Sequence, residues 1–207
     1  MPDTPRSDTT VSDTTVSDTI SRRRIAPIIV LVVAALLGGL FWVLAGSKAE
    51  NDTSGIIKSH LLGKPAPSVR STTLDDQPFD LSRRKGSWVV LNFFNSTCIP
   101  CVAEHPELVR FAEQQTVLGA DGAELYTVLQ FGNRLDSVRA FFDKSEGDWP
   151  VVRDDDGAIN VSFGVAQVPE TFIIDPDGIV RLRWAGAIDA ETLTTLLQQQ
   201  RAAYVQQ

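Results

Sequence analysis

Cys98 and Cys101 are the only cysteines in this 207-residue chain, and they lie in the stretch Asn-Ser-Thr-Cys-Ile-Pro-Cys. A disulfide between them would close a very short loop, and the stabilisation from loop closure grows with loop length. A structural staple is therefore a weak explanation for the pair. The spacing favours two thiols that open and close by exchange with other disulfides.

The segments around the cysteines predict how the thiols are activated. Residues 87–94 form an apolar run of the kind found in a central buried strand, and a helix is expected to begin at the cysteines. Unpaired N–H groups and the dipole at a helix start favour a thiolate. Pro100 suits the first turn. We expect Cys98 to attack substrates and the deeper Cys101 to resolve the mixed disulfide.

A metal site is the main alternative for these residues. Cys98, Cys101, His105 and His60 could supply four zinc ligands, but a second closely spaced pair is missing. Attachment of c-type haem is excluded because Val102, not histidine, follows Cys101. His105 is interpreted as a surface or helix-packing residue. We therefore expect no metal and no cofactor other than the redox-active disulfide itself.

The charge distribution bears on the class of partner. The chain has a net charge of -7, and acidic and basic residues cancel within the first 24 positions. The negative charge therefore belongs to the part of the chain that follows. Nucleic-acid binding needs clustered Lys and Arg, so we expect no nucleic-acid partner.

The N-terminal third reads as a membrane anchor with flanking segments. No charged residue occurs between Ile25 and Ala45, and this run is long enough to cross a bilayer. A cleaved signal peptide is the alternative. Three arginines precede the run, which by the positive-inside rule places the N-terminus in the cytoplasm. The predicted organisation is a disordered tail, a transmembrane anchor in the lipid bilayer, a polar tether and one globular domain, at 1–24, 25–45, 46–64 and 65–207.

The globular part alternates predicted strands and helices. An Asp-Pro-Asp-Gly turn after residue 174 is a hairpin signal, and Asp189 can cap the last helix. The order predicts an α/β fold of thioredoxin-like plan, with a mixed central sheet flanked by helices, a parallel first half and an antiparallel last pair. Strands are expected at 79–81 (an edge strand), 87–94, 124–131, 150–152, 170–174 and 179–184, and helices at 98–118, 135–144, 158–163 and after 189. The first helix should pack Val102, Leu108, Val109 and Phe111 inward.

Two motifs carry a family resemblance. One is Val-Val-Leu-Asn-Phe-Phe at 89–94 running into Cys-Ile-Pro-Cys at 98–101, with Glu104 and Pro106 following. The other is Gly-Val-Ala-Gln-Val-Pro-Glu-Thr-Phe-Ile-Ile-Asp at 164–175. Together they resemble the membrane-anchored thioredoxin-like thiol-disulfide oxidoreductases of the TlpA, ResA and CcmG (DsbE) type, over about residues 60–205.

The resemblance implies roles at matching positions. Pro169 would be the cis-proline facing the dithiol, leaving the Val168 backbone free to pair with a substrate strand. Glu104 would influence proton transfer to the resolving thiol, or else be a solvated residue of the helix start. Asn92 would stand near the site where thioredoxin has a buried Asp, and Glu170 would lie beside the bound substrate.

The resemblance also implies a function and its surroundings. It implies a single-pass protein of the bacterial cytoplasmic membrane with an extracytoplasmic domain, which reduces cysteine-containing proteins such as apocytochrome c using a membrane thiol-disulfide electron donor. Thr97 departs from the usual Trp, which leaves substrate choice open. An oxidant of folding secreted proteins, a non-catalytic binding module and a peroxidase are the alternatives. A monomer is the default expectation.

Overall fold

The computed structural model describes residues 27–39 and 55–206. The chain divides into two units, Met1–Asp52 and Thr53–Gln207, which are described separately. The predicted tail at 1–24, both ends of the predicted anchor, and residues 46–54 of the tether lie outside the described residues.

In the first unit, residues 27–39 form a helix whose side chains are all exposed. The apolar residues Ile28, Val30 and Leu31 are between 60% and 70% exposed. Within the two described ranges, no helix has both the length and the apolar character needed to span a bilayer. The anchor predicted at 25–45 therefore stays a prediction.

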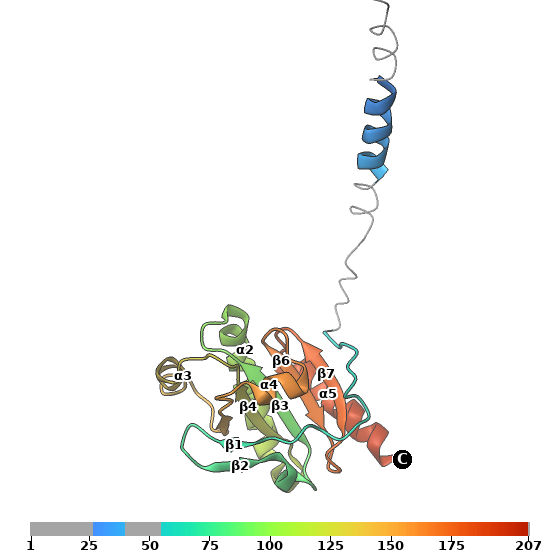
Figure 1. Cartoon of the computed structure of the whole chain (residues 1–207). Coiled ribbons are helices and arrows are strands. Elements are labelled where there is room, and N and C mark those ends of the chain that lie inside the picture. Colours follow the sequence, from blue (N-terminus) through green and yellow to red (C-terminus); the bar gives the residue numbers. More distant parts are fainter. Residues whose placement is uncertain (1–26, 40–54, 207) are drawn as a thin grey trace, which may run out of the picture. The chain divides into compact units, whose positions relative to one another are not determined.

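The second unit is built on a five-stranded mixed sheet (Figure 1). The central strand β3 is paired in parallel with β4, which is paired in parallel with β5. On its other side β3 is antiparallel to β6, which forms the antiparallel pair with β7. This confirms the predicted parallel first half and antiparallel end. The order across the sheet is β5 (Val151–Val152), β4 (Glu124–Leu129), β3 (Val89–Phe94), β6 (Glu170–Ile174) and β7 (Val180–Ala185).

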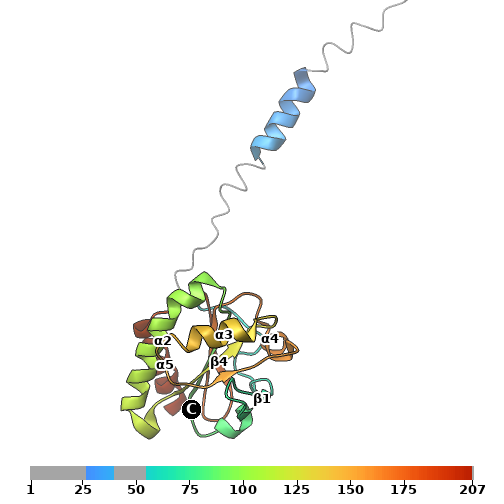
Figure 2. The same ribbon diagram turned by 90° about the vertical axis from the view of Figure 1, so that its left-hand side faces the viewer.

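Helices cover both faces of the sheet (Figures 1 and 2). Alternation along β3 shows why, because Val89, Leu91 and Phe93 enter one apolar cluster whereas Val90 enters another. The Val90 cluster is covered by two helices in contact with each other, α2 (Ile99–Val117) and α5 (Ala190–Val205). The opposite cluster is covered by α3 (Leu135–Phe142), α4 (Ala158–Phe163) and the chain before β3.

Local signals set most helix boundaries. Pro100 lies in the first turn of α2, as predicted, and the Asp189 side chain accepts a hydrogen bond from the Thr192 N–H at the start of α5. Leu108 and Phe111 are buried against the sheet as expected, but Val102 is 40% exposed. The prediction that Val102 packs inward is wrong, since its position on α2 faces solvent.

The predicted edge strand at 79–81 is only partly correct. Residues Pro78–Asp80 do form a strand, β2, but it pairs with β1 (Arg70–Thr72) in a separate two-stranded sheet. Leu81 already belongs to a short 3-10 helix, Leu81–Arg84, which Asp80 caps through the Ser82 N–H. A second 3-10 turn, Gly119–Asp121, follows α2.

The tether boundary at residue 64 is also corrected. Residues 55–66 run along the outer edge of β7: the Ala185 N–H donates to the Gly55 carbonyl (2.7 Å), and the Val180 N–H donates to the Lys64 carbonyl (2.9 Å). Leu61 between them is buried. The glycines and serines of the predicted tether concealed this docking, which is made largely by backbone hydrogen bonds to an otherwise open strand edge.

Candidate active site

The dithiol lies at the start of α2, just after the loop that connects it to β3. Cys98 is the N-cap of α2 and forms a disulfide with Cys101. The Cys101 N–H donates to the Cys98 sulfur at 3.2 Å, which is one of the free donors of the helix start. Cys101 is fully buried and Cys98 is half-buried. The sulfur that a substrate can reach is therefore the one held at the positive end of the helix.

The loop before β6 lies across from the accessible sulfur. The Val168–Pro169 peptide bond is cis, as the resemblance implied. The Val168 carbonyl oxygen is 3.5 Å from the Cys98 sulfur. The Val168 side chain is buried, so any part of this residue that meets a substrate is backbone. The structure thus brings together Cys98 and Val168, which are 70 positions apart.

A hydrogen-bonded loop holds the chain just before Cys98. The Asn95 side chain accepts from the N–H and hydroxyl of Thr97 (2.9 and 2.8 Å) and donates to Gln130 (2.9 Å). The Ser96 hydroxyl donates to Asn133 (2.8 Å). These contacts join the loop before α2 to the loop after β4. The sequence analysis missed them, although the polar residues directly after two predicted parallel strands were a usable signal. Thr97 itself is exposed, beside Cys98.

A second buried group lies beneath α2. The Glu104 carboxylate is 2% exposed and accepts from the Asn92 amide (3.1 Å) and the Ile188 N–H (3.0 Å). Asn92 also donates to the Thr171 hydroxyl (3.1 Å). Burial raises the pKa of Glu104 to about 7, against the lowering effect of these two hydrogen bonds. Glu104 is one turn beyond Cys101 on the same face of α2, so a carboxyl that can exchange a proton near neutral pH stands behind the resolving thiol.

The alternative interpretation of Glu104 as a solvated residue of the helix start is therefore wrong. Its position matches the predicted place near the dithiol. Asn92 likewise lies in the middle of β3, fully buried, and its side-chain oxygen has no hydrogen-bond partner among the described residues.

Glu170 is placed differently from its predicted position beside substrate. It is 3% exposed, and its carboxylate accepts from Arg183 (2.7 Å) and from the Ala166 N–H (3.2 Å). Arg183 also donates to the Gly164 carbonyl (2.7 Å) and lies over the Phe172 ring. The prediction is corrected because this carboxylate is engaged inside the domain by an adjacent arginine on β7.

The histidines do not join the cysteines. His105 is buried, its ring packs against Phe141, Phe142 and Trp149, and its Nε2 is 2.7 Å from the Glu146 carbonyl oxygen. Burial lowers the pKa of His105. This confirms the helix-packing interpretation. Across the described ranges no three His, Cys, Asp or Glu side chains are grouped as metal ligands.

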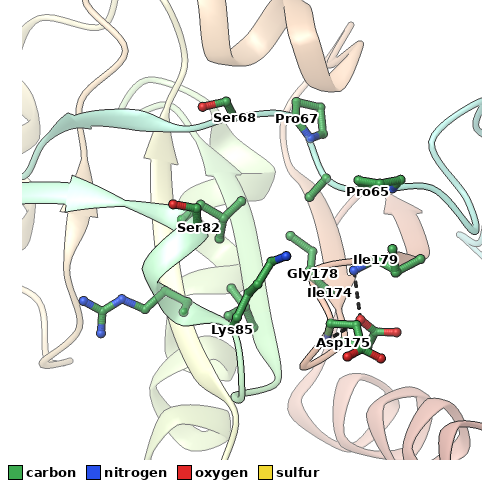
Figure 3. A pocket seen from close by; sticks show the side chains of 14 residues that line it. Pro65, Pro67, Ser68, Ser82, Lys85, Ile174, Asp175, Gly178 and Ile179 are labelled. Atoms are coloured by element: carbon green, nitrogen blue, oxygen red, sulfur yellow. Dashed lines mark hydrogen bonds between the residues drawn. The ribbon is translucent and has the colours of Figure 1, made fainter.

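A cavity of about 360 Å³ lies at the other end of the sheet (Figure 3). Its walls include Val89, the first residue of β3, and Ile174, the last residue of β6. The dithiol follows the last residue of β3, and Pro169 precedes the first residue of β6. The cavity and the dithiol therefore lie at opposite ends of strands β3 and β6, and the cavity is no part of the redox site.

A mixed sheet with a Cys-x-x-Cys pair at a helix start, facing a cis-proline loop, defines a thioredoxin-like thiol-disulfide oxidoreductase. Comparison with known proteins agrees. The family model described as AhpC/TSA family matches residues 62–183. The DsbE homolog of Paracoccus denitrificans, a thiol:disulfide interchange protein, is 32% identical over 178 residues, which cover 83% of this chain and 91% of that one. The thiol:disulfide interchange protein HelX of Rhodobacter capsulatus is 30% identical, with 80% and 88% covered.

Among solved structures, a Chlorobium tepidum protein assigned as thiol:disulfide interchange protein DsbE superimposes with a TM-score of 0.58 at 27% identity. The match covers 69% of this chain and 96% of that one. The chain therefore belongs to the AhpC/TSA family, among the DsbE-type thiol:disulfide interchange proteins. It is a thiol-disulfide oxidoreductase whose redox group is the Cys98–Cys101 pair.

Proposed function

We propose that this protein reduces disulfides in cysteine-containing proteins, with disulfide-bonded apocytochrome c as the favoured client, on the outer face of a bacterial cytoplasmic membrane. The single observation that carries the exchange mechanism is the placement of the half-buried Cys98 sulfur at the α2 N-terminus, 3.5 Å from the Val168 carbonyl. A substrate strand lying along Val168 brings its own sulfur to this atom.

The exchange proceeds in two displacements. In the reduced protein, the Cys98 thiolate attacks one sulfur of the substrate disulfide, the substrate S–S bond breaks, and one substrate thiolate leaves. The Cys101 thiolate then attacks Cys98, which releases the second substrate thiolate and forms the Cys98–Cys101 disulfide. Two electrons pass from the dithiol to the substrate. A membrane thiol-disulfide donor returns them by the reverse exchange.

Glu104 accepts the Cys101 proton before the second displacement. Its carboxyl is buried, lies on the Cys101 face of α2, and has a pKa raised to about 7 by burial, so it changes protonation state within the working pH range. The unpaired Asn92 oxygen can accept a hydrogen bond from the protonated carboxyl once the amide turns. The catalytic set is therefore Cys98, Cys101, Glu104 and the Pro169 loop.

Membrane attachment through residues 25–45 belongs to the same proposal. Its support is the absence of charge over that run, the three arginines before it, and the exposure of every side chain of helix 27–39. A helix that is apolar on all sides and uncovered by its own unit is suited to a lipid environment.

The test of the mechanism is a pair of cysteine variants of the full chain. Cys98→Ser should abolish insulin disulfide reduction, whereas Cys101→Ser should accumulate a mixed disulfide between substrate and Cys98. Retention of reductase activity by Cys98→Ser would falsify the mechanism. A non-catalytic binding module predicts binding of the client by both variants and no reduction by the wild type. Peroxide consumption that depends on Cys98 would favour the peroxidase instead.

Direction is tested by the reduction potential of the dithiol, measured by equilibration with glutathione. A potential near that of thioredoxin, about -270 mV, supports a reductase. A potential near that of DsbA, about -120 mV, identifies an oxidant of folding secreted proteins. The second result would remove the cytochrome client from the proposal.

A further inference from the structure

Phe131 is a large apolar side chain that is exposed at the end of the sheet where the dithiol lies. It directly follows Gln130, two positions after the end of β4, and is 59% exposed. Leu129, the last residue of β4, is paired with Phe94, the last residue of β3, in the parallel register. The chain from β3 leads to Cys98 and the chain from β4 leads to Phe131, so both residues follow the same end of the sheet.

Hydrogen bonds hold these two loops together. The Gln130 N–H donates to the Phe94 carbonyl (2.8 Å), and the Gln130 side chain accepts from the Asn95 amide (2.9 Å). The Ser96 hydroxyl reaches Asn133 (2.8 Å). Phe131 stands between the two residues of its own loop that make these bonds. Its backbone is therefore positioned relative to the dithiol rather than free to drift.

The ring is also supported from one side. A β-carbon built on Gly157 would lie 3.1 Å from Cγ of Phe131, and Gly157 has a positive φ of 76°. The glycine therefore lets the ring rest against the backbone at the start of α4. One side of the ring contacts the domain and the remainder faces solvent, which is the arrangement of a preorganised apolar contact.

A second apolar side chain stands next to the reactive sulfur. Ile99, between Cys98 and Pro100, is 82% exposed. At position 97 this chain has an exposed Thr, which offers little apolar area before Cys98. The exposed apolar surface at this end of the sheet is therefore supplied by Ile99 and by Phe131 on the neighbouring loop.

We infer that Phe131, together with Ile99, forms a docking surface for apolar residues flanking the cysteine of an extended polypeptide substrate, and that Phe131 determines this preference. The inference rests on the proposed exchange at Cys98 and names its substrate class. A substrate strand beside Val168 presents a sulfur to Cys98, and its neighbouring side chains then lie over the surface that Ile99 and Phe131 leave exposed. Burial of apolar area there lowers the free energy of the mixed-disulfide complex.

The probes are two synthetic octapeptides that differ only in the residues flanking a central cysteine, Leu in one and Ser in the other. Each is prepared as a mixed disulfide with glutathione. The reduced full chain should convert it to free peptide thiol and free glutathione, while Cys98–Cys101 becomes the disulfide, so that two electrons are transferred. Each reduced molecule reacts once because no reductant regenerates it, and the rate measured with peptide in excess gives the second-order rate constant for each peptide.

We expect the wild type to prefer the Leu peptide about tenfold, which corresponds to the transfer free energy of roughly half a phenylalanine side chain. In Phe131→Ala the preference should fall to about twofold or less, and Phe131→Leu should restore most of it. Val117→Ala is the matched control, because Val117 is 87% exposed at the far end of α2, and it should keep the wild-type preference.

The outcomes separate the two levels of proposal. If the wild type reduces neither peptide faster than Cys98→Ser does, the proposed function fails. If it reduces both peptides equally well, the exchange stands and the docking surface is refuted. If Phe131→Ala keeps the tenfold preference, the surface lies elsewhere and the assignment to Phe131 is overturned. Thermal unfolding of each variant shows whether a change in the ratio comes from a folded protein.

Discussion

Two glutamates are buried beside the dithiol end of the sheet, and the structure accommodates them in opposite ways. Glu170 on β6 forms an ion pair with Arg183 on β7, in which both side chains are nearly inaccessible. Glu104 on α2 receives only two neutral donors, from Asn92 and Ile188. The pKa of Glu104 is raised to about 7 by burial. One carboxylate is paired with a cation, whereas the other has no cation beside it and titrates near neutral pH.

The contrast shows that burial alone does not define a functional carboxylate. An ion pair holds its charge in place and contributes to the arrangement of β6 and β7. A carboxyl that has no cation beside it can gain or lose a proton when its surroundings change. Both glutamates were predicted to lie near the dithiol, but only Glu104 has a pKa raised to near neutrality by burial, which is why the proposal assigns it the proton exchange with Cys101.

The largest effect is expected from removing the cation beside Glu170. Arg183→Met removes the guanidinium that pairs with Glu170 and lies over Phe172, so the Glu170 charge is left buried without a cation. We expect a loss of about 3–5 kcal/mol in the free energy of unfolding at pH 7, measured by urea denaturation. The matched variant Glu170→Gln/Arg183→Met should recover part of the loss. A loss below about 1 kcal/mol in the single variant would contradict a buried, charge-neutralised pair.

The pH dependence of stability should reveal Glu104. Its pKa rises from 4.5 to about 7 on folding, so the native state binds the extra proton and stability is lost as pH increases through that window. The expected loss is about 3 kcal/mol between pH 4.5 and 8. Glu104→Gln should lack it, since an amide does not titrate in this range. The new amide can be accommodated because the Asn92 oxygen, which has no partner among the described residues, can accept from it after the Asn92 side chain turns.

The measurement is the difference in unfolding free energy between wild type and Glu104→Gln across this pH range. The difference removes the opposite contribution of His105, whose lowered pKa makes stability rise with pH below its usual value of 6.5. Parallel curves for the two proteins would show that Glu104 does not titrate in this window.

A kinetic effect of similar size is expected for the second displacement. Without a proton acceptor behind Cys101, Glu104→Gln should slow the resolution of a preformed mixed disulfide by about a hundredfold, which is close to 2.7 kcal/mol. The rate should also lose its inflection near pH 7. Stopped-flow fluorescence under single-turnover conditions gives both quantities. A slower rate that keeps the same inflection would assign Glu104 a purely structural role.

The smallest effect is expected at a carboxylate that stays in water. Asp189 caps α5, and its pKa is lowered by hydrogen bonds from the backbone and side chain of Thr192. Asp189→Ala should cost about 1 kcal/mol at pH 7. Because a lowered pKa stabilises the folded state only above the usual value, the cost should diminish as pH falls below about 4. A cost that stays constant down to pH 2 would contradict the charged cap.

Local sequence was sufficient for the parts of this protein that depend on neighbours in the chain. The Cys-x-x-Cys spacing, Pro100 in the first turn and Asp189 as a cap were predicted because capping and helix-start effects act over three or four residues. Strand β6 and helix α4 were predicted with their observed bounds. The mixed order of the sheet followed from the order of elements.

The other features depend on contacts between distant parts of the chain. Residues 55–64 were assigned to a tether because of the glycines and serines in the 46–64 segment, but the open edge of β7 binds their backbone. Glu104 meets the Ile188 N–H across 84 positions, and Glu170 finds its arginine on the adjacent strand. The loop that carries the exposed Phe131 is tied to the loop before Cys98 by side chains from both segments.

The amino-acid sequence by itself thus determined the redox chemistry, since that chemistry needs only two thiols and a helix start. Which carboxyl has a raised pKa, and which apolar side chains stay exposed near the dithiol, was decided only by the tertiary structure. The reason is that desolvation and charge pairing depend on the atoms that surround a group in space, whatever their separation along the chain.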